Sequence, residues 1–161
     1  RTAYGTIEGH GYNIPVLRND VIISKRQLLE ARLFAASVVQ LDADFLSFEE
    51  YTELLAYAHS IGLEVVVAIH SAEQLTYAQT EADIVAVVNY NLEDYSADLQ
   101  KSLDLVTQLP TDKVLLSEGG ISTVEDIRRL KAAGYHGVVL GNCLMSQPDP
   151  AAALQQLRSA L

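Results

Sequence analysis

Short apolar runs alternate with helical segments along this chain, and this alternation restricts its fold more than any other feature. Continuous apolar runs of this length are typical of parallel strands buried on both faces. The pattern predicts strands at 14–17, 37–41, 64–69, 84–88, 113–117 and 137–140. It predicts helices at 24–35, 48–60, 71–79, 98–108, 122–133 and 149–160. Ser122 and Glu125 have the spacing that caps a helix start, and Asp149 before Pro150 is a second expected cap. We therefore expect an α/β protein built from six βα units.

Two architectures accommodate six βα units. A TIM-type barrel needs eight strands and about 250 residues, so 161 residues would form an incomplete barrel with two open edges. A doubly wound open sheet of six strands is the competing fold. Residues 1–13 contain three glycines and no strand pattern, which predicts an irregular N-terminal segment that supplies neither missing unit. We interpret 1–161 as a single domain in which 14–161 form the βα part.

Composition and charge exclude several classes of function. The formal net charge is −10, which argues against a nucleic-acid partner because such binding relies on Lys and Arg. No apolar run approaches the roughly 18 residues of a membrane span. Cys143 is the only cysteine, so no internal disulfide can form, and we expect it to be a packing residue. These features predict a soluble protein of a reducing compartment, either the cytoplasm or the stroma or matrix of an organelle.

Glycines follow the last two predicted strands. Gly119 and Gly120 come after the run at 113–117, and Gly141 and Asn142 come after the run at 137–140. Glycine lets backbone N–H groups approach a ligand closely, and a helix start adds free donors. In a TIM barrel the loops after the last two strands commonly form a phosphate site in this way. The sequence therefore predicts phosphate binding at these four residues.

Other polar side chains stand at predicted strand ends, where barrels place catalytic groups. We expect Glu118 to be a remnant of catalysis or a partner of Arg18. Asp42 and Asp44 could hold a cation together with Glu118, but carboxylates at strand ends are common in an acidic protein. We expect His70 to be a hydrogen-bonded structural residue. We therefore expect no metal and no other cofactor.

Several segments carry a family pattern in family order. They lie at 14–20 (IPVLRND), 30–32 (EAR), 58–70, 88–92 (VNYNL), 117–121 (SEGGI), 140–145 (LGNCLM) and 148–150 (PDP). Together they resemble the indole-3-glycerol phosphate synthases, which are βα-barrel lyases of tryptophan biosynthesis. The resemblance implies an incomplete TIM-type barrel whose six units correspond to the family's units three to eight. It also implies that the family's first two units, which carry a catalytic glutamate and a catalytic lysine, are absent from this chain.

The same resemblance implies that most chemical positions have changed. Asn19 stands at the position of a catalytic lysine, Ala68 at that of a catalytic glutamate, Val88 at that of an asparagine and Tyr90 at that of an arginine. Glu118 is kept, but Gly119 replaces the serine that follows it. The family's reaction closes a ring with loss of CO2 and water, and it therefore needs a proton donor and a proton acceptor. An amide and a methyl group supply neither.

We therefore expect a catalytically inactive relative that serves as a structural or interaction subunit and keeps a phosphate pocket. The alternative is a working indole-3-glycerol phosphate synthase, a carbon–carbon lyase, or a related barrel enzyme whose remaining parts lie outside this chain. Exposed edges at the first and last strands predict a protein partner, a longer N-terminal region or a second copy that covers them. Val16, Leu17, Val138 and Val139 would lie near that contact, and a phosphorylated small molecule is the expected ligand.

Overall fold

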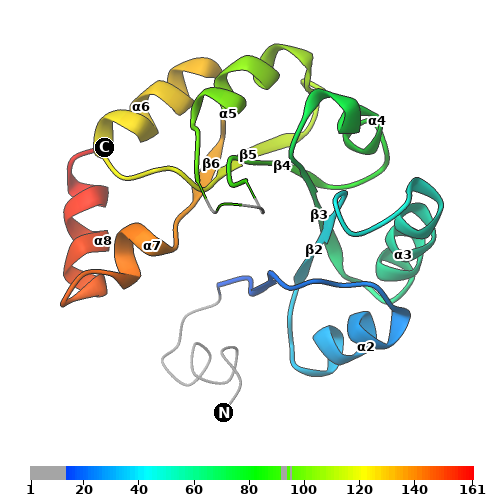
Figure 1. Ribbon diagram of the computed structural model, residues 1–161. Coiled ribbons are helices and arrows are strands. Elements are labelled where there is room, and N and C mark those ends of the chain that lie inside the picture. Colours follow the sequence, from blue (N-terminus) through cyan, green and yellow to red (C-terminus); the bar gives the residue numbers. More distant parts are fainter. Residues whose placement is uncertain (1–13, 92–93, 95) are drawn as a thin grey trace.

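The computed structural model describes residues 14–91, 94 and 96–161, so the irregular segment expected at 1–13 lies outside the described residues. Within the described part, six parallel strands form one sheet whose spatial order follows the chain (Figure 1). They are β1 (Leu17–Arg18), β2 (Val38–Asp42), β3 (Glu64–Ile69), β4 (Ile84–Val88), β5 (Val114–Glu118) and β6 (Gly137–Val139). A doubly wound sheet reverses its strand order at a switch point, and this sheet does not. The fold is an incomplete TIM-type barrel, as predicted, and the open doubly wound alternative is wrong.

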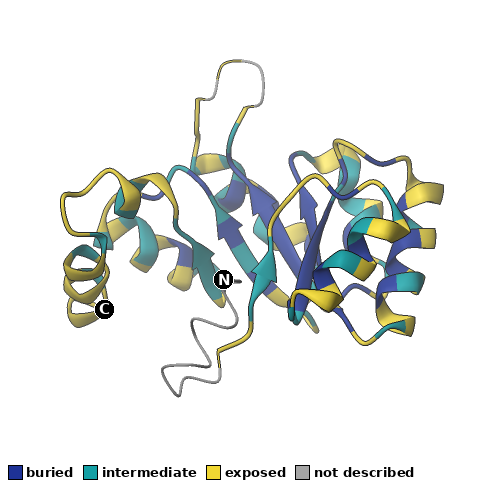
Figure 2. Ribbon diagram, turned by 90° about the horizontal axis from the view of Figure 1, so that it is seen from below, coloured by how far each residue is buried: buried dark blue, intermediate teal, exposed yellow. Residues whose placement is uncertain are grey.

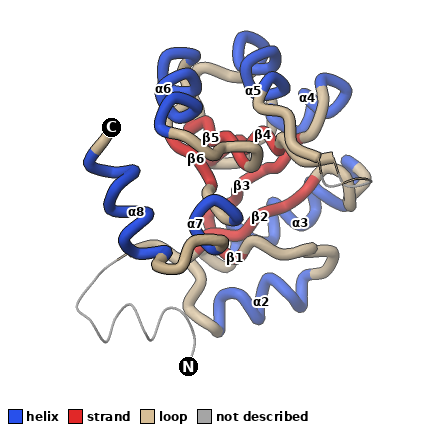
Figure 3. Tube along the Cα trace, turned by 60° about the vertical axis from the view of Figure 1, so that its left-hand side comes forward, coloured by secondary structure: helices blue, strands red, loops and turns tan. Residues whose placement is uncertain are grey.

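Helices follow the strands around the outside of the curled sheet (Figures 1 and 3). They are α2 (Lys25–Leu33), α3 (Phe48–Ser60), α4 (Leu75–Ala78), α5 (Gln100–Leu105), α6 (Val124–Ala133), α7 (Asn142–Met145) and α8 (Pro150–Ser159). The predicted helix at 71–79 is divided into a 3-10 turn at Ala72–Gln74 and α4. The predicted helix at 98–108 is divided into α5 and a 3-10 turn at Val106–Gln108. The sequence pattern did not predict the single turn of α7.

Most residues of the central strands are buried (Figure 2). Two apolar clusters cover the faces of the sheet, and the larger one lies on its outer side. Because side chains alternate along a strand, neighbouring residues such as Val65 and Val66 point to opposite faces. Val65 belongs to the outer cluster, which packs under the helices, whereas Val66 contacts Val38 and Ala86 in a small inner cluster. The inner face is therefore apolar where these three residues meet. On β2 this apolar face gives way to Gln40 and Asp42 toward the carboxyl end, whereas β3 and β4 stay apolar there, and the polar residues of β2 contribute to the site.

The cap of helix α6 lies one residue later than the sequence indicates. Its cap is Thr123, whose side chain accepts from the Asp126 backbone N–H, while the Asp126 carboxylate accepts from the Thr123 backbone N–H. The expected pair of Ser122 and Glu125 is therefore wrong. Ser122 with Glu125 and Thr123 with Asp126 have the same capping spacing, so the sequence alone could not distinguish them. The expected cap of α8 is confirmed, since Asp149 accepts from Ala152 N–H and Pro150 follows it.

The two end strands of the sheet are short. Among the described residues, strand β1 pairs only with β2, through Leu17 and Arg18, although the sequence predicted a strand at 14–17. Strand β6 likewise has β5 as its single partner in the described part of the chain, and its three residues are half-buried. A strand pairs only as far as its neighbour provides partners, so these bounds depend on the fold rather than on local pattern. Among the described helices, none combines the length and the hydropathy that crossing a membrane requires.

Candidate functional site

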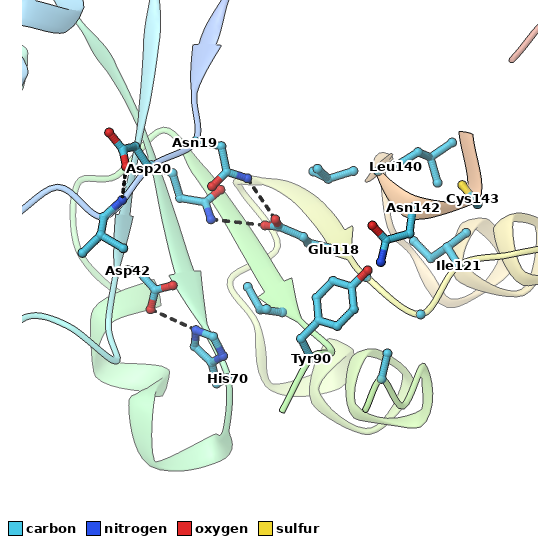
Figure 4. Close-up of a pocket in the computed structure, with 18 of the residues that line it drawn as sticks. Asn19, Asp20, Asp42, His70, Tyr90, Glu118, Ile121, Leu140, Asn142 and Cys143 are labelled. Atoms are coloured by element: carbon cyan, nitrogen blue, oxygen red, sulfur yellow. Dashed lines mark hydrogen bonds and ion pairs between the residues drawn. The ribbon is translucent and has the colours of Figure 1, made fainter. Parts of the chain in front are cut away.

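A pocket of about 880 Å³ opens at the carboxyl ends of the strands (Figure 4). Residues from the segment after β1, from β2 and from every later strand end contribute to its walls. The four residues expected to bind phosphate all line it, together with Glu118 and three of the four replaced family positions: Gly119, Gly120, Gly141, Asn142, Glu118, Asn19, Val88 and Tyr90. Ala68 is the exception, because it is fully buried and does not reach the pocket. Phosphate binding itself stays a prediction.

Two glycine loops form one side of this pocket. Gly119 and Gly120 have φ angles of +87° and +69°, a left-handed backbone that favours glycine. The loop before α7 contributes Gly141 and Asn142. Among the described residues, neither the Gly120 N–H nor the Asn142 N–H has a hydrogen-bond acceptor. Backbone donors from two neighbouring loops are therefore available to an anion in the pocket.

Tyr90 and Gly119 are in direct contact. A Cβ added at Gly119 would fall well inside van der Waals contact with the Tyr90 ring. The phenol extends across the pocket toward Asn142 (Figure 4). The two replaced positions thus depend on each other, because the aromatic ring occupies space that any side chain at position 119 would need. This coupling between residues 29 positions apart cannot be read from the sequence alone.

Glu118 is held by two amides. Asn19 Nδ2 donates to Glu118 Oε1 over 2.9 Å, and Gln40 Nε2 donates to Glu118 Oε2 over 3.2 Å. The expected pairing of Glu118 with Arg18 is wrong. Arg18 donates instead to Asp20 and to the Gln27 carbonyl of α2, over 2.9 and 2.8 Å. Consecutive residues of an extended segment point to opposite sides, so Arg18 and Asn19 cannot both face the pocket.

Gln40 is the most deeply buried polar group of the pocket wall. Its residue is 4% exposed, and its Oε1 atom has no hydrogen-bond partner among the described residues. A buried acceptor without a donor costs about 1–3 kcal/mol. Sequence reasoning missed Gln40, although a polar residue within the apolar run 38–41 was an available signal.

His70 lies between two carboxylates. Its Nε2 is 2.9 Å from Asp42 Oδ1, and its Nδ1 is 3.5 Å from Asp44 Oδ2. Burial lowers the pKa of His70, but the hydrogen bond to Asp42 and the charges of both aspartates outweigh burial, so the pKa is raised overall. The ring is thus biased toward its charged form, and the prediction of a hydrogen-bonded histidine agrees with this geometry.

The cation site considered at Asp42, Asp44 and Glu118 does not form. Within the described part of the chain, the group whose ligand atoms all lie within 4.8 Å of one another is Asp42, Asp44 and His70, without Glu118. In this arrangement each ring nitrogen of His70 already faces a carboxylate. The three side chains therefore satisfy one another as an ion-pair group.

Asn89 fixes the loop that follows β5. Its Nδ2 donates to Ser117 Oγ over 3.0 Å and to the Gly119 carbonyl over 2.8 Å. Its Oδ1 accepts from the backbone N–H and the hydroxyl of Ser102, at the start of α5. The hydroxyl of Tyr135 donates to the Ser102 carbonyl, and burial raises the pKa of Tyr135 to about 12, so this donor stays protonated. Sequence reasoning did not single out Asn89, because a polar residue after a strand is common in loops.

Ala68 stands where the family has a catalytic glutamate, and a different acid, Asp42, lies beside it on the next strand. Asp42 on β2 is the direct Cα partner of Ala68 on β3. Asp42 lines the pocket, whereas Ala68 is covered. The inner face of the sheet therefore carries a carboxylate one strand away from the replaced position, and that carboxylate is bound to His70.

Comparison with known proteins identifies the family. The family model described as indole-3-glycerol phosphate synthase matches residues 9–157. An indole-3-glycerol phosphate synthase of Bacteroides thetaiotaomicron is 40% identical over 149 residues, which are 92% of this chain and 57% of that protein. One from Dichelobacter nodosus is 38% identical over 145 residues, 89% of this chain and 54% of that protein. The chain thus spans little more than half the length of these curated relatives.

Solved structures agree on the fold. The 3-hexulose-6-phosphate synthase of Salmonella typhimurium superposes with a TM-score of 0.78 at 16% identity, over 98% of this chain and 77% of that chain. A structure titled "Native KDPGal structure" superposes with a TM-score of 0.67 at 18% identity, over 97% and 74%. At such low identity the likeness concerns architecture alone. The family match and the sequence relatives carry the assignment, and by them this chain belongs to the indole-3-glycerol phosphate synthase family.

Proposed function

We propose that this chain binds a phosphorylated small molecule in the pocket at the carboxyl ends of its strands, and that its own side chains do not perform the family's ring closure. One observation carries the proposal. The loops after β5 and β6 line the same pocket, and the Gly120 and Asn142 N–H groups have no acceptor among the described residues. Two sets of free backbone donors at adjacent strand ends favour an anion such as phosphate.

The side chains around the proposed phosphate site argue against ring closure. Asn19 is engaged as a donor to Glu118 and has no titratable proton. Ala68 is fully buried, and Val88 is 6% exposed with no polar atom on its side chain. A reaction that moves protons needs groups with pKa values near neutral pH. We infer that the chain acts through binding or assembly, as a non-catalytic member of its family.

Phosphate titration followed by amide NMR tests the binding proposal. Inorganic phosphate should shift the amide signals of Gly120, Gly141 and Asn142 before other signals. The variant Gly141→Ala should weaken binding because its Cβ would narrow the approach to the backbone donors; that Cβ meets no protein atom within 4 Å, and a thermal melt verifies folding. Gly62→Ala, remote from the pocket, controls for indirect effects: at φ +75° it should lose some stability to left-handed strain but keep the phosphate shifts. Shifts that cluster outside these loops contradict the proposal.

A second candidate function is the lyase activity of the relatives, in a polypeptide or complex that supplies further parts. The observation that favours it is the 40% identity to an indole-3-glycerol phosphate synthase, together with the retained Glu118 in the pocket. Incubation of the purified protein with the indole-precursor substrate, followed by indole fluorescence, distinguishes the two functions. Turnover that Glu118→Gln abolishes would establish the lyase and contradict the non-catalytic proposal.

The ends of the sheet support a role in assembly. Strands β1 and β6 each have one pairing partner among the described residues, so each has one edge of N–H and C=O groups without a strand beside it. Such edges favour pairing with another chain or segment. We propose that a protein partner, further residues of the same polypeptide or a second copy covers these edges near Leu17 and Val138. Sedimentation of the purified chain checks this, and a compact, stable monomer contradicts it.

A further inference from the structure

We propose that a second pocket of this chain, at the amino end of β6, binds a carboxylic acid that has an apolar body. The pocket has a volume of about 460 Å³, which lies within the range of small-molecule sites. It shares no lining residue with the pocket at the carboxyl ends of the strands, so the proposal is independent of the phosphate binding proposed above. Three observations carry it: how the chain forms this pocket, the apolar character of its wall, and the donors on its polar side chains.

Helix α6, strand β6 and the end of α8 form the pocket. Gly134 ends α6 with a left-handed φ of +115°, and its N–H donates to two carbonyls of the last helical turn. This turn sends the chain back along its own helix, so Lys131 of α6 and Val138 of β6 line the same space. Arg128 donates to the Ala160 carbonyl over 2.7 Å, which holds the end of α8 beside α6 (Figure 1). The pocket therefore lies between elements that backbone hydrogen bonds join.

Most of the pocket wall is apolar. Three of its apolar side chains are at least partly exposed, namely Ile127, Val138 and Leu161. Leu130 and Tyr135 also line the pocket and belong to the buried core. The hydroxyl of Tyr135 already donates to a backbone carbonyl of α5, so it offers no free polar atom to the pocket. An apolar ligand body is favoured here, because its burial removes apolar surface of both partners from water.

The polar side chains of this pocket are Lys131 and His136, and both offer donors. The Leu115 N–H donates to His136 Nδ1 over 3.0 Å, so that nitrogen carries no proton and the neutral ring keeps its proton on Nε2. Within the described part of the chain, neither the Lys131 ammonium nor His136 Nε2 has a hydrogen-bond or ion-pair partner. Among the residues that the structure describes, no Asp or Glu lines the pocket, although the chain has a net charge of −10.

A carboxylate matches these donors. An ammonium and an imidazole N–H both make charge-assisted hydrogen bonds to a carboxylate, which presents two acceptor oxygens. A cationic ligand would meet the like charge of Lys131, and a divalent metal ion would find none of the carboxylate ligands that it prefers. The remaining wall is apolar, so the charge of the ligand belongs at one end and its apolar body at the other. The ligand class is therefore an apolar monocarboxylate.

Amide NMR of the full chain, titrated with three probes, tests the proposal. The probes are octanoate, octylamine, which has the same body with the opposite charge, and butyrate, which has the same head with a shorter body. Below its micelle-forming concentration, octanoate should shift the amide signals of Leu115, Gly137 and Val138. It should bind at least about tenfold more tightly than either other probe. Leu115 is diagnostic, because its N–H is bonded to the imidazole ring that a bound carboxylate would contact.

The contrary outcomes are distinct. If octylamine binds as tightly as octanoate, the pocket does not recognise the charge, and if butyrate does so, the apolar wall contributes nothing; either result makes the proposal wrong. It is also wrong if octanoate does not bind, or if it shifts Gly120 and Asn142 instead of the signals around β6. A dimer in sedimentation that octanoate neither binds nor dissociates would show that a second copy fills the pocket. None of these results affects the phosphate titration that tests the other pocket.

A pair of variants assigns the binding to its charge. Lys131→Met keeps an unbranched side chain and removes the ammonium, so octanoate affinity should fall by roughly tenfold. Arg129→Met is the matched control, because it removes an exposed charge from the same helix at a position that does not line the pocket, and it should change affinity by less than about twofold. Thermal melts verify that both variants fold. The dipole of α6 alone favours a cation in its last turn, so a loss of stability in Lys131→Met with unchanged affinity contradicts the proposal.

Discussion

Replacing Asn89 with leucine should destabilise the fold more than any substitution on the pocket surface. Asn89 is 1% exposed and makes four hydrogen bonds through its side chain. After Asn89→Leu, the hydroxyls of Ser102 and Ser117 still bond to each other over 2.7 Å. Two backbone groups lose their partners, namely the Gly119 carbonyl and the Ser102 N–H.

The size of the effect follows from these two orphaned groups. A buried polar group without a partner costs about 1–3 kcal/mol, so Asn89→Leu should lower the free energy of unfolding by about 2–6 kcal/mol. Domains of this kind are stable by roughly 5–15 kcal/mol in total, so the variant should lie near the limit of folding. Urea denaturation followed by circular dichroism at 222 nm measures the loss.

Two further variants calibrate this prediction. Ser117→Ala leaves one Asn89 N–H without an acceptor and removes the bond between the Ser117 and Ser102 hydroxyls, but the Ser102 hydroxyl still donates to Asn89, so the variant should lower the free energy of unfolding by about 1–3 kcal/mol, half as much. Ser60→Ala removes an exposed hydroxyl that bonds the Tyr57 carbonyl, and it should cost less than about 0.5 kcal/mol. If Asn89→Leu costs no more than Ser60→Ala, the network does not hold the loop in the way described.

Three other predictions concern the site. His70 has a folded pKa above its ordinary value of 6.5, so the stabilisation from Asp42 and Asp44 should be complete below about pH 6.5 and be lost as pH rises through the raised pKa. Histidine NMR titration and stability measured against pH check this, and Asp42→Asn should remove much of the dependence; an unchanged profile contradicts it. Gly119→Ala should cost more than the ~1–2 kcal/mol of left-handed strain, because its Cβ meets the Tyr90 ring. Adding Tyr90→Ala should recover the excess in thermal melts, and simple addition of the two losses refutes the coupling. Tyr90→Ala alone should keep phosphate shifts at Gly120 in NMR, since the donors there belong to the backbone; their loss would assign the binding to the phenol instead.

Strands β3 and β4 could be predicted to the residue and β2, β5 and β6 to within one residue, whereas β1 could not. The bounds of β3 and β4, Glu64–Ile69 and Ile84–Val88, agree with the sequence pattern because both strands are paired on two sides and are buried after their first residue. Strand β1 begins three residues later than predicted, since only Leu17 and Arg18 find partners on β2. Local hydropathy cannot show where a neighbouring strand ends.

The candidate site could also be predicted only in part from the sequence. That the glycine loops would meet could be predicted, because the ends of adjacent parallel strands lie side by side. The contact between Asn19 and Glu118 joins residues 99 positions apart and depends on the curvature that brings β1 toward β5. The choice between Arg18 and Asn19 as its partner depends on which way β1 faces, and two paired residues are too few to show an alternation.

The chain-ordered sheet has a consequence for how the molecule opens. Strand β3 is flanked by strands on both sides and is almost fully buried, whereas β6 has one neighbour and stays half-buried. Amide exchange should therefore be slowest in β3 and become faster toward β6, as local opening follows contact density. Gly120 follows β5 and Gly141 follows β6, so an anion bound to both would link β6 to β5, its one partner among the described strands. Such a ligand would slow amide exchange most in β6, the strand that is least protected when the pocket is empty. Amide exchange in β6 would therefore report whether the pocket is occupied.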